Sequence, residues 1–177
     1  MNKMINQLTE LQGPYFHLFV GKEKEFNEIY TSMLEHKPQT RSFYVEGEKC
    51  KTYASFDIEF STKLDLDISY FETGGGLGEA LNQELEWEGW NGFVLMINHY
   101  WEFLQYENSS VRRILTDSVY EWVNGRDFDP ECSTPPMPFH VVFQCDSGDE
   151  EELIEKMKSS NIEEYDIIRS EDIIQDL

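Results

Sequence analysis

The residues that could do chemistry in this sequence are four histidines, a run of glycines and a large excess of carboxylates. The histidines are His17, His36, His99 and His140. None stands four residues from another histidine or beside a cysteine at metal-binding spacing. His17 and His140 fall within predicted strands, where a hydrogen-bonded structural histidine is the simpler interpretation. The sequence therefore predicts neither catalytic residues nor metal ligands.

The glycine run has only a superficial likeness to a phosphate-binding turn. Gly74, Gly75 and Gly76 are followed by Leu77 and Gly78. A phosphate-binding turn follows a buried strand, and in the P-loop a Lys-Ser/Thr pair comes next. The preceding residues, 69–73, lack the apolar pattern expected of such a strand, and no Lys-Ser/Thr pair follows. We interpret the run as a loop leading into a helix and predict no cofactor. A small-molecule enzyme that uses this loop is a third-ranked alternative.

The carboxylates also form no coherent catalytic or calcium-binding set. Asp127, Asp129 and Glu131 alternate along the chain but lack the glycine and the distal glutamate of a calcium loop. The sequence contains no Gly-x-Ser-x-Gly motif. Most carboxylates are best interpreted as a solvated acidic face. We therefore expect a protein that is not an enzyme.

The charge balance is the strongest compositional signal. The 177 residues include 14 Lys and Arg against 35 Asp and Glu, a net charge of −21. Such a field repels phosphate backbones and anionic lipid surfaces, so we expect neither a nucleic acid nor a membrane as partner. It attracts basic proteins and accelerates their association. The 12 Phe, 9 Tyr and 4 Trp are enough to build a packed core, which argues against a disordered acidic tail.

Cysteine usage and hydropathy predict a cytoplasmic protein. Cys50, Cys132 and Cys145 are sparse and odd in number, as expected of free thiols in a reducing compartment. Residues 1–13 contain no apolar core of a signal peptide. The longest apolar run, Phe93–Ile97, is far too short to span a bilayer.

Strand-like segments alternate with amphipathic helical segments along the chain. The expected strands are 15–20, 42–45, 93–97, 139–145 and 165–168. The expected helices are 26–34, 53–64 with Thr52 as N-cap, 77–85, 100–106, 111–122 and one opened by the acidic run 146–152. This alternation predicts an α/β fold with a largely parallel sheet. Strand 93–97 is apolar throughout, which is typical of a central strand buried on both faces.

From Phe43 onward, short segments follow one another in a recognisable order: Phe43-Tyr-Val-Glu-Gly47, the helix 53–64, Tyr70-Phe71, Leu85-Glu86-Trp87, Gly92-Phe-Val-Leu-Met-Ile97, the helix ending at Glu121-Trp122, and Pro138-Phe-His-Val-Val142. This order resembles the barstar family, the intracellular inhibitors of secreted bacterial ribonucleases. The resemblance covers about residues 42–144. It implies a small parallel β-sheet with amphipathic helices on its faces, extended by extra strand-helix elements at both ends.

The resemblance also implies a division of the chain and a partner-binding surface. Residues 1–41 would form an N-terminal extension, 42–145 the barstar-like domain and 146–177 a C-terminal extension packed on it. The implied partner-binding residues are Tyr70, Phe71, Glu72, Gly74, Gly75, Gly76, Glu79 and Asp117. An ungapped alignment places the three glycines where the family has Asn-x-Asp. A small gap would instead place Glu79-Ala80-Leu81 on the family's Asp-Ala-Leu, and both alignments stay open.

The function implied by the resemblance is inhibition of a basic ribonuclease or related toxin inside the cell that makes it. Carboxylates on a rigid helix and loop would occupy cationic sites that normally hold substrate phosphates. The alternative is a protein-interaction or regulatory module that keeps the fold and has lost ribonuclease inhibition. The triple glycine favours that alternative, because it replaces an acidic residue of the family's motif.

Overall fold

Five parallel strands form one sheet in the computed structural model, which describes residues 2–66, 77–83, 85–127 and 133–174. The strands are β1 (Phe16–Val20), β2 (Arg41–Glu46), β3 (Phe93–Asn98), β4 (Phe139–Cys145) and β5 (Tyr165–Arg169). Their order across the sheet is β2-β3-β4-β1-β5, and every described pairing is parallel. The prediction of an α/β fold with a small parallel sheet is confirmed.

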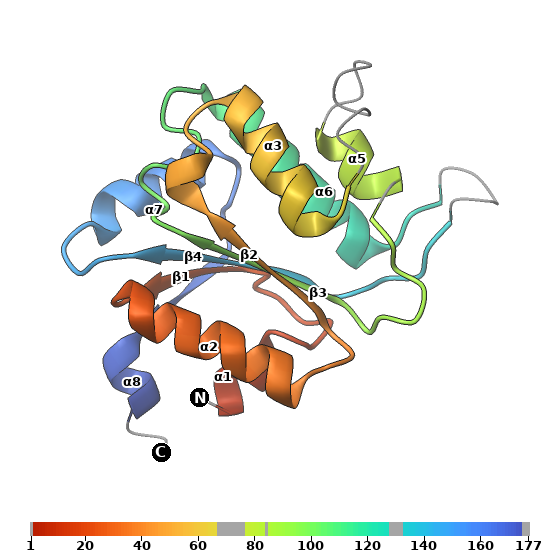
Figure 1. The fold of residues 1–177 in the computed structure, drawn as a ribbon, viewed down its shortest axis with the longest axis horizontal. Helices are drawn as coiled ribbons and strands as arrows, with labels where there is room; N and C mark the ends of the chain where they lie inside the picture. The colour runs from red at the N-terminus through yellow and green to blue at the C-terminus, as the bar shows by residue number, and fades with distance from the viewer. Residues whose placement is uncertain (1, 67–76, 84, 128–132, 175–177) are drawn as a thin grey trace.

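Helices cover both faces of the sheet (Figure 1). One face carries α3 (Tyr53–Leu64), α5 (Leu77–Gln83), α6 (Ser109–Asn124) and α7 (Glu150–Ser159). The other carries α1 (Asn2–Gln7), α2 (Glu23–His36) and α8 (Ser170–Ile174). Two hydrophobic clusters, one on each side, bury the three inner strands β1, β3 and β4 along their whole length. Among the described helices, none is long and apolar enough to cross a membrane.

Helix α3 shows how local sequence sets an element. The Thr52 side chain accepts a hydrogen bond from the backbone N–H of Ser55, as an N-cap residue does. Phe56, Phe60 and Leu64 then recur at helical spacing and are buried against the sheet. The helix therefore begins and packs as the sequence predicts.

The centre of the sheet agrees with the sequence as well. All six residues of β3 are buried, and β3 pairs with β2 on one side and β4 on the other. Above it, the Trp122 ring of α6 meets Phe93 edge-on with ring centroids 5.0 Å apart. Trp122 is fully buried, so the predicted register of α6 is confirmed.

The segment after β3 differs from the prediction. Residues 100–106 form successive hydrogen-bonded turns in place of the expected short helix. The Lys156 amino group from α7 donates hydrogen bonds to the carbonyl oxygens of Tyr100, at 2.6 Å, and Phe103, at 2.5 Å. Leu104 has a φ of 50°, outside the helical region. Tertiary contacts therefore override the local helical pattern.

The two ends of the chain add the elements that the sequence placed outside the barstar resemblance. Strand β1 is an inner strand between β4 and β5, and β5 is an edge strand. Helix α1, which the sequence did not predict, buries Met4 and Ile5, and the residue after its last turn, Leu8, is buried as well. The sheet is thus continuous from the N-terminal segment to the C-terminal one, while the three-part division of the chain stays an interpretation of the sequence.

Candidate functional site: the carboxyl edge of the sheet and the face of α5 and α6

All five strands end at one edge of the sheet, called here the carboxyl edge. Parallel α/β sheets bind ligands outside this edge, where the direction of the strand order reverses. Here the chain passes from β1 out to the edge strand β2 and then returns through β3 and β4 towards β1. The carboxyl edge around β1, β3 and β4 is therefore the first place to search for a site.

Two buried amide side chains tie together the loops at the carboxyl edge. Asn98 Oδ1 accepts a hydrogen bond from the N–H of Gly47 at 2.9 Å, and its Nδ2 donates to Glu23 Oε1 at 2.8 Å. Gln144 Oε1 accepts from the N–H of His99 at 2.9 Å, and its Nε2 donates to the carbonyl oxygen of Gly21, also at 2.9 Å. The ends of four strands and the start of α2 are thereby joined in one network.

The start of α2 does not offer the anion site that a nucleotide would need. Only Gly21 and Lys22 separate β1 from α2, too short a link to wrap phosphates as a P-loop does. The N–H of Lys22 donates to Glu25 Oε2 at 2.8 Å, and Glu23 also stands in the first helical turn. These carboxylates occupy the positive end of the helix dipole, where a bound phosphate would otherwise lie.

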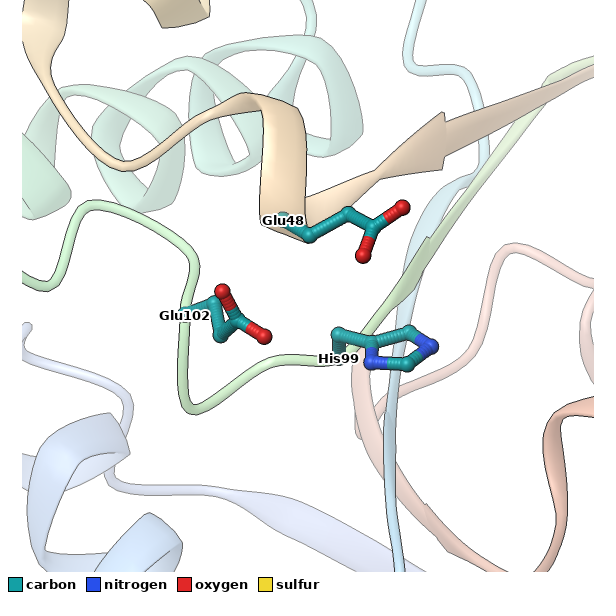
Figure 2. A group of neighbouring side chains, drawn as sticks. All are labelled: Glu48, His99 and Glu102. Carbon is teal, nitrogen blue, oxygen red and sulfur yellow. The ribbon is translucent and has the colours of Figure 1, made fainter.

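A group of possible metal ligands lies at the same edge. One ligand atom from each of Glu48, His99 and Glu102 lies within 4.8 Å of the others. Figure 2 shows the carboxylates of Glu48 and Glu102 turned towards the imidazole of His99. Glu48 comes from the short 3-10 helix η1 (Gly47–Lys49), and the other two residues come from the turn after β3. The sequence prediction of no metal ligands overlooked this group.

Linear spacing could not reveal the group, because two of its members are about fifty residues apart in sequence and meet only when β2 pairs with β3. One signal was present nonetheless. Both η1 and His99 follow directly after predicted strands, so a parallel pairing brings them to one edge of the sheet.

A second surface lies over α5 and α6. The indole Nε1 of Trp122 donates to the carbonyl oxygen of Leu81 at 3.2 Å, and the amide of Asn82 hydrogen-bonds to Glu121 Oε2. A Cβ on Gly78 would lie only 3.3 Å from Cγ2 of Ile114, so the glycine permits close packing of the two helices. Helix α5 is therefore fixed along α6.

Two carboxylates follow one another along the outer side of α6. Asp117 is exposed, and the half-buried Glu121 stands four residues later, on the same side of the helix. Burial raises the pKa of Glu121, and the negative charge of Asp117 raises it further, while Arg126 and the hydrogen bond from Asn82 act in the opposite direction. Two like charges are thus held next to each other on a rigid helix.

The sequence-predicted partner-binding residues are distributed unevenly over the described structure. Asp117 lies exposed on α6, as expected of a contact residue. Glu79 lies in α5, next to α6, but its side chain is outside the described part of the chain. The others, Tyr70, Phe71, Glu72, Gly74, Gly75 and Gly76, all lie outside the described residues.

The two histidines expected to be structural are hydrogen-bonded to each other in the core. His17 Nε2 and His140 Nδ1 are 3.0 Å apart, and His140 Nε2 lies 2.8 Å from the carbonyl oxygen of Glu10. Burial lowers the pKa of His17 to about 3 and also lowers that of His140. This part of the sequence interpretation is confirmed. Cys50 and Cys145 are buried free thiols, and Cys132 lies outside the described residues.

Comparison with known proteins gives a likeness of fold alone. No protein-family model matches the chain, and no curated protein matches it in sequence. A chain in the structure of Drosophila ORC bound to AT-rich DNA and Cdc6 is similar, with 14% identity and a TM-score of 0.50. A chain in the structure of Drosophila ORC bound to GC-rich DNA and Cdc6 has 9% identity and a TM-score of 0.58.

Both matches cover 96% of this chain but only 52% and 28% of the other chains. The protein therefore spans about half or less of the length of these structural relatives. At such identities the likeness concerns the arrangement of strands and helices and does not extend to what those assemblies bind.

Proposed function

We propose that this protein is an acidic inhibitor that binds and blocks a basic ribonuclease or related toxin inside the cell that makes it. The observation that carries the proposal is the pair of carboxylates, Asp117 and Glu121, on the outer side of α6 beside α5. These are the two helices that the barstar resemblance makes interfacial. The order β2-α3-α5-β3-α6-β4 also follows the order of that family's elements.

The charge of the surface suits such a partner. Among the described residues, no cationic side chain lies within ion-pair distance of Asp117, so its carboxylate is available to an incoming cation. A ribonuclease cleft presents Arg, Lys and His to its phosphate substrate. Carboxylates held by a packed helix meet those cations without losing much side-chain freedom, and the net charge of −21 accelerates the encounter.

Nucleotides and nucleic acids suit the molecule less well. The carboxylates of α2 occupy the position at the carboxyl edge where a phosphate would bind. The chains with a similar fold come from assemblies bound to DNA, but the negative field of this protein opposes contact with a phosphate backbone. We therefore propose no nucleic-acid partner and no enzymatic activity.

The alternative is a protein-interaction module that keeps this fold without inhibiting a ribonuclease. It is favoured by Gly74, Gly75 and Gly76, which an ungapped alignment places on the family's acidic motif. Both proposals predict a basic protein partner, and they differ in whether the captured partner cleaves RNA and stops doing so when bound.

The test is capture of the partner on the purified chain, followed by an RNA-cleavage assay of the captured protein with and without the chain. Inhibition supports the first proposal, while binding without inhibition supports the alternative. The variant Glu79→Lys with Asp117→Lys should weaken binding by about 2–5 kcal/mol if the contacts are buried. Association should slow as salt rises, because the Debye length falls from about 10 Å at 0.1 M to about 3 Å at 1 M.

The matched control is Glu151→Lys with Glu152→Lys, which reverses two exposed carboxylates on α7. It changes the net charge by the same amount, so it slows electrostatic steering equally but leaves the face of α5 and α6 intact. If both double variants weaken binding to the same degree, the partner surface lies elsewhere and the assignment of this face is wrong.

A further inference from the structure

We propose that Glu48, His99 and Glu102 form a binding site for one divalent transition-metal ion at the carboxyl edge of the sheet. The proposal is independent of the inhibitor function, because this group lies in the segments that follow β2 and β3, and none of its residues belongs to α5 or α6. It rests on the convergence of three donor groups and on a carboxylate that orients the histidine from outside the group.

The donor atoms need only a small movement to reach the distances at which they would all bind one ion. They lie within 4.8 Å of one another. Bonds from a transition metal to histidine nitrogen or carboxylate oxygen are about 2.0–2.2 Å, so two ligands of one ion are at most about 4.4 Å apart. Glu48 is exposed and Glu102 partly exposed, so rotation of their side chains can make this change.

The backbone brings the group together through a close approach at Gly47. A Cβ at Gly47 would lie 2.2 Å from the carbonyl oxygen of Asn98 and 2.8 Å from that of His99, so only glycine permits this contact. The Gly47 N–H also donates to the Asn98 side chain. These contacts hold η1, and with it Glu48, against the turn that carries His99. In that turn the N–H of Glu102 donates to the carbonyl oxygen of His99 at 2.9 Å.

Glu23 supplies the second, independent observation. Its Oε2 lies 3.3 Å from His99 Nε2, while its Oε1 accepts the hydrogen bond from Asn98. Metal-binding histidines commonly donate their other ring N–H to a carboxylate, which fixes the tautomer and the orientation of the ring. With Nε2 held by Glu23, the remaining nitrogen, Nδ1, has its lone pair free for a metal.

The donor set indicates the kind of metal. Imidazole nitrogen suits Zn²⁺ and carboxylate oxygen suits Mn²⁺, so this mixed set can hold either ion, whereas Ca²⁺ and Mg²⁺ prefer oxygen alone. Three protein ligands leave coordination positions for water or a further group. Lys51 forms an ion pair with Glu102 Oε2 and therefore competes with the ion for this carboxylate.

The first experiment titrates the full, metal-free chain with Zn²⁺ or Mn²⁺ by calorimetry. We expect one ion per chain. His99→Ala should abolish saturable binding, and Glu23→Gln should weaken it by about 10–100-fold, as loss of an orienting partner does. Lys51→Ala should tighten binding, since it removes the competitor. His36→Ala, which changes an exposed histidine on α2, is the matched control and should bind like the wild type.

A second readout locates the ion without reference to affinity. The rings of His99 and Trp101 are 4.9 Å apart between centroids, whereas Trp122 is buried under α6. Sub-stoichiometric Mn²⁺ should therefore broaden the indole NMR signal of Trp101 before that of Trp122, and His99→Ala should remove the difference. Unchanged binding in His99→Ala, or no saturation at millimolar Zn²⁺ and Mn²⁺, would overturn the proposal.

Discussion

Glu23 and Glu102 at the carboxyl edge interact with neighbouring side chains, whereas Asp117 on α6 has no ion pair among the described residues and lies near Glu121, a second carboxylate that Asn82 binds. At the edge, Glu23 accepts a hydrogen bond from Asn98 and lies beside the His99 ring, and Glu102 forms an ion pair with Lys51. On α6, Asp117 and Glu121 stand four residues apart with like charge. In the described part of the chain, Asp117 has no ion pair.

The difference distinguishes carboxylates that stabilise the fold from carboxylates that do not. A carboxylate that binds neighbouring loops contributes to the native arrangement, and its loss would loosen that arrangement. A carboxylate held next to another of the same sign costs a small amount of stability, which the proposed cationic partner would offset. Net charge alone, which is −21, could not distinguish these two cases.

The largest expected effect tests whether α6 is a rigid support for its outer carboxylates. Trp122 is fully buried, packs edge-on against Phe93 and donates to the carbonyl oxygen of Leu81 in α5. Trp122→Ala should lower the free energy of unfolding by about 3–5 kcal/mol, the usual cost of removing a large buried aromatic side chain. Denaturant titration measures this loss.

Trp122→Phe separates packing from the hydrogen bond to α5. It keeps most of the apolar contact but loses the indole N–H, so the expected loss is smaller than that of Trp122→Ala. A loss below about 1 kcal/mol for Trp122→Ala would mean that α6 is not anchored through this side chain, and the support would have to come from elsewhere in the helix.

The next effect tests whether the carboxyl edge depends on its own polar network. Asn98→Ala removes the acceptor of the Gly47 N–H and the donor to Glu23. Leaving a buried donor unpaired costs about 1–3 kcal/mol, so we expect a loss of about 2–3 kcal/mol in unfolding free energy. Amide hydrogen exchange at Gly47 should also become faster.

Asn98→Asp is the comparison variant for this network. It keeps an acceptor for Gly47 but replaces the donor to Glu23 with a carboxylate, so it should restore slow exchange at Gly47 without restoring full stability. If Asn98→Ala is as stable as the wild type, strand pairing alone holds the edge. The polar side chains of the edge would then contribute no more to stability than those on the outer side of α6.

The sequence predicts the elements of the fold well where local pattern and packing agree. Helix α3 begins after its Thr52 cap, and β3 is buried because its apolar run is continuous. The predicted helix at 100–106 is wrong, and the segment forms turns instead. Lys156, more than fifty residues away, donates hydrogen bonds to carbonyl oxygens of this segment. Local periodicity carries no information about such a distant partner.

The candidate sites divide in the same way. Asp117 is selected by the resemblance, which places it on the last helix of the family; it is exposed on α6, and its role in binding stays a prediction. The group of Glu48, His99 and Glu102 could not be selected, because its members meet only through the pairing of β2 with β3 and the close approach at Gly47. Strand order is a property of the whole sheet, so sequence spacing alone does not reveal the group.

The smallest expected effect tests the repulsion on α6 directly. The pKa of Glu121 is raised, so this side chain contributes most to stability below its unfolded pKa and loses that contribution as pH rises through its folded pKa. Asp117→Asn removes one cause of the shift at nearly equal helix propensity. It should stabilise the protein by about 0.2–0.5 kcal/mol at neutral pH, the usual size of one like-charge pair on a helix. The gain should vanish in acid, where the Glu121 carboxyl group is protonated and carries no charge. Urea titrations of the wild type, Asp117→Asn, Glu121→Gln and the double variant, from about pH 3 to pH 7, isolate the pairwise energy. A gain that is the same at both ends of this range would show that charge is not its cause, and repulsion between the two carboxylates would then no longer support the proposed partner surface.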